Sequence, residues 1–165
     1  MIDLGVRFLK SMLKVISKKE IRHYLCGLHV KCDGESITVT GSNGHMLVSR
    51  TYLYSGQVFD EFIIPVVALQ NACNIGSTTL NPIEKTLAGL KFKPIAGKYP
   101  NFNRVMTAMV EKQSDHVCFN LHYLSILQSV YEAVKPKQNL RINFGESFGW
   151  HKSDDLTMAI GNLGV

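Results

Sequence analysis

The chain has 165 residues, of which 45% are hydrophobic and 19% are charged, a composition typical of folded globular proteins rather than disordered ones. No run approaches the roughly 20 apolar residues that a membrane span requires, and the basic N-terminal segment lacks the apolar stretch of a signal peptide. We therefore expect a cytoplasmic protein without a membrane partner. The net charge of +5 favours a polyanionic partner.

The first predicted unit begins with a short strand at residues 2–4 and an amphipathic helix at residues 6–19. Three strands follow, at about residues 22–32, 36–40 and 45–53. The turns between them contain Gly, Asn and Asp, which tolerate the positive φ of tight hairpins.

The helix of the first unit has a basic stripe. Arg7, Lys10, Lys14 and Lys18 recur at intervals of three, four and four, which places them on one side of a helix. An apolar face lies opposite and consists of Leu9, Met12, Leu13 and Ile16. The stripe is either an ordinary solvated helix face or a surface that follows the phosphates of duplex DNA without reading its sequence. We predict the second.

A second unit begins with a strand at residues 61–64 and a helix at residues 66–75. Pro65 starts this helix where a missing N–H has no cost, and Gly76 can end it in the left-handed conformation. Two or three compressed strands follow, the last at residues 90–95.

A third unit begins with a predicted strand at residues 116–120, where Asn120 is a suitable cap for a helix at residues 121–134. Strands are predicted at residues 139–144, 148–152 and 156–160. The residues that we expect this helix to bury are Leu124, Leu127, Val130, Tyr131 and Val134. Three such units predict an α+β fold with helices on one face of mainly antiparallel sheets.

Signs of catalytic or metal chemistry are weak. The four cysteines occur singly, without the spacing of a zinc or redox site, and are predicted to be buried, reduced thiols. Gly41 and Gly44 lack the Lys-Ser/Thr of a phosphate-binding loop. We predict no enzyme activity, no metal and no cofactor.

Two segments carry a resemblance to a known family. They are Gly-Lys-Tyr-Pro-Asn-Phe-Asn-Arg-Val at 97–105 and Ser-Asn-Gly-His-Met-Leu at 42–47, supported by Arg-His-Tyr-Leu-Cys-Gly at 22–27 and by Phe-Asn at 119–120. In order and separation they resemble the bacterial DNA polymerase III beta subunit, the sliding clamp. Asn43 and Met46 depart from the Asp and Arg that the family has in the turn.

The resemblance implies a domain organisation. Residues 1–106 look like a complete middle domain of a clamp, residues 107–115 like a linker, and residues 116–165 like the second half of the last domain. Family rings contain six domains of two units each, so about four chains of this kind would restore a ring. We expect the third units of two chains to pair and such dimers to meet through their first units; an open dimer is the alternative.

The resemblance also implies a peptide-binding cleft between these parts, with an apolar floor and a few directed polar groups. The matching positions are Leu25, Ser42, Gly44, His45, Leu47, Pro100, Arg104, Val105, Asn120, Tyr123, Ile160 and Gly161. We expect Ile160 to join Leu25, Leu47 and Val105 in the floor.

The implied function is that of a DNA polymerase processivity factor, a homo-oligomer that contacts duplex DNA and binds peptides of a DNA polymerase or clamp loader. One alternative is an interaction decoy that forms no ring and competes with a full-length clamp for its peptides. Another is a nucleic-acid-binding module unrelated to replication.

Overall fold

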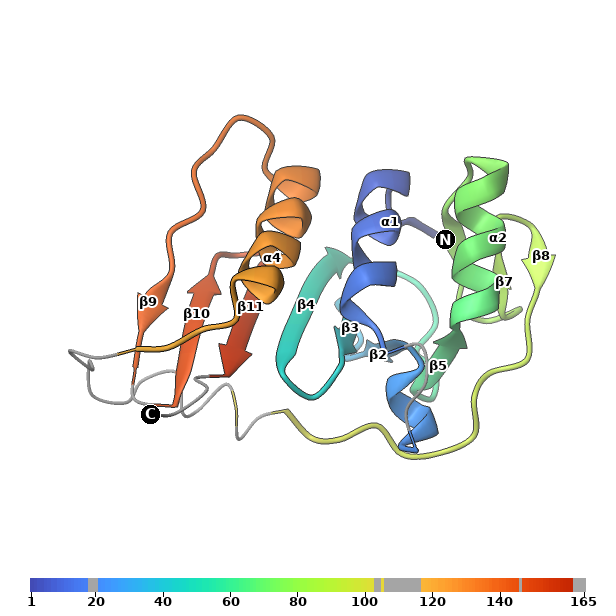
Figure 1. Ribbon diagram of the computed structural model, residues 1–165. Coiled ribbons are helices and arrows are strands. Elements are labelled where there is room, and N and C mark those ends of the chain that lie inside the picture. Colours follow the sequence, from blue (N-terminus) through green and yellow to red (C-terminus); the bar gives the residue numbers. More distant parts are fainter. Residues whose placement is uncertain (18–20, 103–104, 106–116, 146, 162–165) are drawn as a thin grey trace.

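The computed structural model describes residues 1–17, 21–102, 105, 117–145 and 147–161. Figure 1 shows its helices and sheets. The α-helices are α1 (Val6–Val15), α2 (Val66–Ile75) and α4 (Leu121–Val134), and a 3₁₀ turn, η1, spans His23–Leu25. The strands are β1 (Ile2–Asp3), β2 (Gly27–Cys32), β3 (Ser36–Ser42), β4 (Met46–Leu53), β5 (Phe62–Pro65), β6 (Thr79–Asn81), β7 (Thr86–Leu87), β8 (Leu90–Lys91), β9 (Asn143–Phe144), β10 (Phe148–Lys152) and β11 (Leu156–Gly161).

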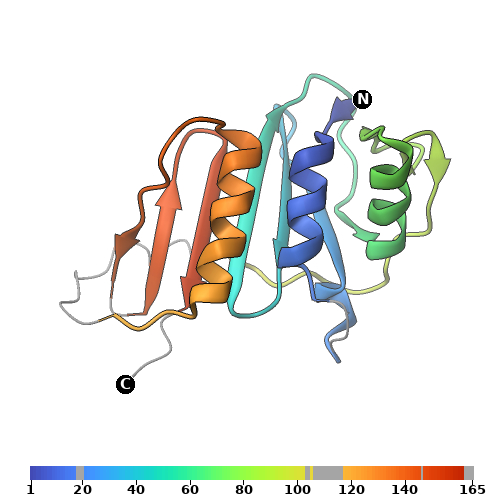
Figure 2. The same cartoon turned by 45° about the horizontal axis from the view of Figure 1, so that its top comes forward.

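The strands form two antiparallel sheets, and the helices lie on one side of them. The larger sheet has seven strands in the order β5-β2-β3-β4-β11-β10-β9, and the smaller has four in the order β1-β6-β7-β8. Figure 2 shows α2, α1 and α4 side by side in a single layer over the sheets. The main apolar core fills the space between the two layers. The predicted α+β fold with helices on one face is therefore confirmed.

The first two units interlock by exchanging the strands that precede their helices. β1, which precedes α1, pairs with β6 of the second unit, and β5, which precedes α2, pairs with β2 of the first. Ile2 lies opposite Leu80, and Ile64 lies opposite Leu28. All four of these side chains are buried in the main core, so separating the two units would break both strand pairs and expose that core.

The third unit attaches to the first unit of the same chain. β11 pairs with β4 from Leu156 opposite Arg50 to Ile160 opposite Met46, and α4 packs against α1. In space, the first unit therefore lies between the second and third units, although it comes first along the chain. The expectation that chains meet through their first units stays a prediction, although β5 and β11 of the same chain already occupy both edges of the strands of that unit. Among the described residues, the terminal strands are β5 and β9 in the larger sheet and β1 and β8 in the smaller one.

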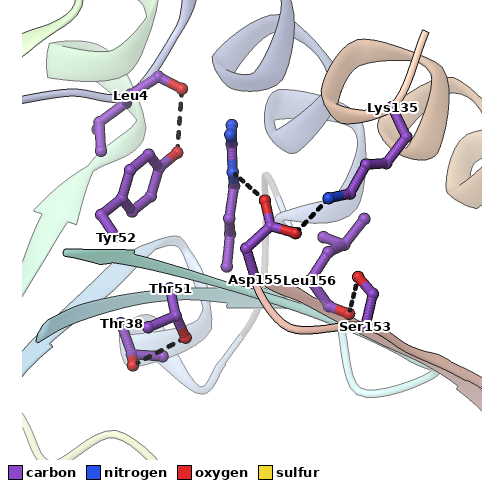
Figure 3. Close-up of polar contacts among 9 residues, drawn as sticks. Leu4, Thr38, Thr51, Tyr52, Lys135, Ser153, Asp155 and Leu156 are labelled. Atoms are coloured by element: carbon purple, nitrogen blue, oxygen red, sulfur yellow. Dashed lines mark hydrogen bonds and ion pairs between the residues drawn. The ribbon is translucent and has the colours of Figure 1, made fainter.

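Polar contacts at the tip of the β10–β11 hairpin reinforce this attachment. The Lys135 ammonium, at the end of α4, lies 2.7 Å from the Asp155 carboxylate, and a dashed line marks this contact in Figure 3. The Arg50 guanidinium of β4 lies 3.7 Å from the same carboxylate and stacks 4.7 Å from the centre of the Tyr52 ring. Tyr52 in turn donates a hydrogen bond to the carbonyl of Leu4. One carboxylate thus links the helix and hairpin of the third unit to the central strand of the first.

Several predicted boundaries are corrected. The helix predicted to reach residue 19 ends at Val15, because Ile16 already has an extended backbone. The strand predicted from residue 22 begins at Gly27, because local hydrogen bonds fold residues 23–25 into η1. The strand predicted at 90–95 is confined to Leu90–Lys91, and that at 139–144 to Asn143–Phe144.

The third unit contains the largest difference. Its helix has the predicted bounds, and the Asn120 side chain caps it by accepting a hydrogen bond from the backbone N–H of His122. Residues 117–120, predicted as a strand, form none. Ile126 replaces Leu124 and Val134 among the fully buried residues of this helix, since those two are half-buried.

We predict that Asp155→Asn lowers the free energy of unfolding at neutral pH by about 1 kcal/mol, because it removes a partly exposed ionic link. Burial raises the pKa of Asp155, but the hydrogen bond and charge of Lys135 and the charge of Arg50 outweigh it, and the pKa lies below its usual value. This contribution to stability is present at a pH above the pKa that Asp155 has in the unfolded chain. It is lost as the pH falls through the lower pKa that Asp155 has in the folded protein.

Urea denaturation at about pH 7 and about pH 3 measures both effects. Asp154→Asn is the matched control, because Asp154 is the exposed neighbour of Asp155 in the same turn. A deficit for Asp155→Asn that persists unchanged at the acidic pH would show that the lost interaction is not ionic.

Candidate functional site

The turn between β3 and β4 contains several of the residues predicted for the cleft. The Asn43 side-chain carbonyl accepts hydrogen bonds from the backbone N–H groups of His45 and Met46, at 2.9 and 3.0 Å. The Ser42 hydroxyl donates to the carbonyl of Met46 and accepts from the N–H of Gly44, whose φ of +88° favours glycine. Asn43 thus supplies the local hydrogen bonds of the turn without a charge, and it fixes the direction of His45.

The beginning of α4 packs against this turn. The His45 ring stacks on the Tyr123 ring, with centroids 5.6 Å apart and planes inclined by 16°. Gly161, at the end of β11, donates a 2.8 Å hydrogen bond to the carbonyl of His45. Asn120 caps the same first turn of α4 that carries Tyr123. The structure therefore brings together predicted residues from three separate segments of the chain.

An apolar patch lies next to these residues, on the sheet face opposite the helices. Leu47 of β4 lies directly opposite Ala159 of β11, and both side chains are buried. Phe102, Val105 and Trp150 pack against this pair. Trp150 is the only tryptophan in the chain, so its fluorescence reports on this patch.

Two of the predicted floor residues lie elsewhere. Ile160 points to the helix side and belongs to the main core, because side chains alternate along β11. Its neighbour Ala159, which the sequence analysis missed, occupies the place beside Leu47. Leu25 forms a separate buried cluster with Ile63 and Tyr99, which Phe102 connects to the patch.

A groove of about 520 Å³ continues from the patch across the same sheet face. Pro100 and the rest of segment 98–102 form one side, and Leu47 lies at its end. Its floor carries hydroxyl groups that pair across strands, with Thr40 2.9 Å from Ser49 and Thr38 3.4 Å from Thr51. The polar side chains of this groove come from alternate positions of four strands, β2, β3, β4 and β11, and local sequence patterns do not predict that these strands are neighbours.

His29 and Tyr99 close one part of the groove. Their rings stack 4.6 Å apart and within 8° of parallel, and His29 Nε2 lies 3.2 Å from a carboxylate oxygen of Glu61. Burial lowers the pKa of His29, although Glu61 opposes this effect. Burial also raises the pKa of the Tyr99 hydroxyl. The neutral forms of both groups are therefore favoured here.

The predicted basic stripe lies on the opposite side of the molecule. Arg7, Lys10 and Lys14 are exposed on α1, the central helix of the layer in Figure 2. The flanking helices α2 and α4 contain no Lys or Arg. Lys18 of the stripe and Arg104 of the cleft lie outside the described residues.

The cysteine prediction is corrected in part. None of the four cysteines forms a disulfide, but Cys26, Cys32 and Cys73 are only half-buried and Cys118 is exposed. Among the described residues, no group of three or more His, Cys, Asp or Glu side chains could hold a metal ion. Within the same residues, every helix is too short or too polar to cross a membrane.

The sequence matches no protein-family model, and a search of curated proteins finds no match. The structure, by contrast, is similar to solved bacterial clamps. It superimposes on the DNA polymerase III beta subunit of Pseudomonas aeruginosa with a TM-score of 0.68 and 14% identity, covering 96% of this chain and 64% of that one. The chain thus spans less than two thirds of that protein.

Two further clamps agree. The Helicobacter pylori beta clamp, solved bound to a DNA ligase peptide, gives a TM-score of 0.69 at 11% identity over 97% of this chain and 63% of its own. The Caulobacter crescentus sliding clamp gives 0.69 at 16% identity over 97% and 63%. The resemblance found in the motifs is therefore confirmed at the level of structure: this chain has the fold of a shortened bacterial sliding clamp.

Proposed function

We propose that the chain is a non-catalytic, sliding-clamp-like processivity factor that contacts duplex DNA through its helix layer and binds partner peptides in the cleft between its first and third units. The observation that carries this proposal is the position of the basic stripe. Arg7, Lys10 and Lys14 are exposed at the centre of the helix layer, on the side of the sheets opposite the cleft. The two surfaces can therefore be occupied at the same time.

The number of cations bears on how DNA is held. The described stripe from Arg7 to Lys14 spans about 10 Å of helix, whereas duplex DNA carries one negative charge per about 1.7 Å of axis. Three cations meet only a few phosphates, so the affinity of one chain for DNA is low. Retention on DNA then requires several chains that act together, which supports a homo-oligomer as the active form.

The cleft suits a short peptide with apolar anchors. Leu47 and Ala159 provide an apolar surface, and the stacked rings of His45 and Tyr123 provide a firm edge beside it. The resemblance implies peptides of a DNA polymerase or a clamp loader as partners, and such peptides fit this surface. The solved Helicobacter pylori clamp with its DNA ligase peptide supports this mode of binding by analogy of fold.

We predict that replacing Arg7, Lys10 and Lys14 together by Ala weakens binding to duplex DNA of any sequence. The slope of log K against log salt concentration should flatten by about 0.9 per lost phosphate contact, or about 2.7 for three contacts. Fluorescence anisotropy of a labelled duplex at several salt concentrations measures the slope.

The control replaces Lys31, Lys98 and Lys152 by Ala, which changes the net charge equally but removes exposed cations from the groove side of the sheets. This variant should keep the wild-type slope. The same flattening in both variants would mean that DNA responds to net charge and not to the stripe.

We also predict that a peptide with Gln followed by Leu and Phe binds with a micromolar Kd, about −8 kcal/mol. Tyr123→Ala should raise the Kd about tenfold, because it removes the ring that stacks on His45. Titration monitored by Trp150 emission measures binding directly at the patch.

Tyr54→Ala is the control for the peptide titration, since Tyr54 is also half-buried and packs against another ring, that of Phe59, away from the cleft. Absence of any emission or heat change up to millimolar peptide would contradict the proposed peptide binding. An equal loss in the two tyrosine variants would attribute the effect to general destabilisation.

A further inference from the structure

A hollow lies at the end of the molecule opposite the third unit, between α2 and the β7–β8 hairpin, and is here called the α2–β8 hollow. Its volume is about 230 Å³. Figure 1 shows α2, β7 and β8 together at one end of the molecule, with α4 and β9–β11 at the other. The structure describes residues 21–102 without a gap, and the lining lies within them. Its apolar members are Pro65, Val67, Ala68, Leu87, Leu90 and Phe92.

The hollow has an apolar floor that belongs to the core and an apolar rim that faces solvent. Leu87 and Phe92 are 2% and 9% exposed and form part of the main core. Leu90 lies opposite Leu87 across the hairpin, so both side chains are on one face of the smaller sheet. Leu90 is nevertheless 47% exposed, and Val67 of α2 is 64% exposed. Apolar side chains that gather around a hollow, instead of being scattered singly, mark an interaction surface.

The volume indicates what kind of group the hollow takes. Pockets for small molecules usually have volumes of about 300–1,000 Å³, so the α2–β8 hollow is smaller than a typical cofactor or substrate site. Protein interfaces, in contrast, are anchored by a few large side chains that each fill a pocket of the partner. One large apolar side chain of a partner protein therefore suits the hollow.

The charge around the hollow is positive. Lys91 and Lys93 belong to its lining and are exposed, whereas no Asp or Glu of the described chain belongs to it. Residues 62–99 contain four lysines and one carboxylate, that of Glu84. The ion pairs among the described residues involve other cations, those of His29, Arg50 and Lys135. Carboxylates of a partner would give Lys91 and Lys93 the counter-charge that this part of the chain does not supply.

Two other occupants fit these observations less well. A second copy joined through the same hollow about a twofold axis would bring the lysines of both copies together, and like charges oppose such a contact. Duplex DNA offers negative charge along its phosphates, but no apolar side chain for the space between Val67 and Leu90. The combination of an apolar hollow and unpaired lysines favours an acidic protein segment.

We propose that the α2–β8 hollow is a second protein-binding site, which receives an acidic partner segment anchored by one Phe or Leu. The apolar anchor enters the hollow between Val67 and Leu90, and neighbouring Asp or Glu side chains pair with Lys91 and Lys93. This site goes beyond the proposed function, because it depends on neither the DNA surface nor the cleft. Since the cleft and the hollow lie far apart on the chain's surface, one chain can hold two protein partners at the same time.

The first experiment uses a labelled hexapeptide in which one Phe is flanked by Asp and Glu, and fluorescence anisotropy measures its binding to the full chain. Replacing Lys91 and Lys93 together by Ala should raise the Kd about tenfold, because it removes two exposed ion pairs. Replacing the Phe of the peptide by Ala should also raise the Kd at least about tenfold, because it removes the anchor. The control replaces Lys10 and Lys14 of α1 by Ala, an equal change in net charge, and should keep the wild-type Kd.

Three outcomes of this titration would overturn the proposal. The first is no anisotropy change up to millimolar protein. The second is an equal loss in the two double-lysine variants, which would reduce the effect to net charge. The third is equal binding of the Ala and Phe peptides, which would assign Lys91 and Lys93 to a polyanion such as a nucleic acid.

The second experiment places a carboxylate in the hollow. Val67→Glu should abolish binding of the peptide, because the new charge pairs with the lysines and repels the peptide. An acidic residue in the first turn of a helix is well tolerated, so the variant should fold. Ile75→Glu is the matched control, since Ile75 is 55% exposed at the other end of α2 and does not belong to the lining. Equal binding by the two variants would place the peptide elsewhere and refute the site.

Two further measurements separate the hollow from the cleft and from self-association. Tyr123→Ala, in the cleft, should leave the Kd of the acidic peptide unchanged, and a loss there would mean that the peptide binds in the cleft. Light scattering without peptide should give the same mass for wild type and Val67→Glu. A mass that falls with Val67→Glu and not with Ile75→Glu would assign the hollow to a second copy. Either contrary result refutes the acidic partner and leaves the DNA and cleft predictions standing.

Discussion

The pairing of β11 with β4 is the interaction on which the arrangement of the whole chain depends. It joins residues more than a hundred positions apart, and the ionic contacts of Asp155 with Arg50 and Lys135 secure one end of it. The same pairing sets α4 beside α1 in the helix layer. It also brings the first turn of α4 against the β3–β4 turn, so that His45 and Tyr123 meet. These residues come together only because the two units share one continuous sheet.

The alternation of side chains along these strands separates two chemical environments. On the helix side, Met46, Val48 and Ile160 fill the core beneath a layer whose central helix is basic. On the other side, Leu47, the threonine hydroxyls and acidic residues such as Glu61 and Asp154 line the patch and the groove. Under the proposed function, a polyanion and a peptide would approach opposite faces, so that the binding of one would not obstruct that of the other.

Local signals in the sequence predicted much of this fold, while signals that depend on distant contacts did not. The Asn120 cap, the Gly76 helix end and the apolar periodicity of α4 are set within a few residues, and they were found. The choice of Ala159 over Ile160 for the patch depends on the phase of alternation in β11, which its register with β4 determines. A shift of one residue moves every side chain to the other face, so a motif match alone could not decide it.

Residues 117–120 show that a local pattern can also predict too much. Their alternation of apolar residues predicted a strand, and the described chain does not form one there. Ordering the backbone costs about 1–2 kcal/mol per residue, and a strand recovers this only through its hydrogen bonds and buried side chains.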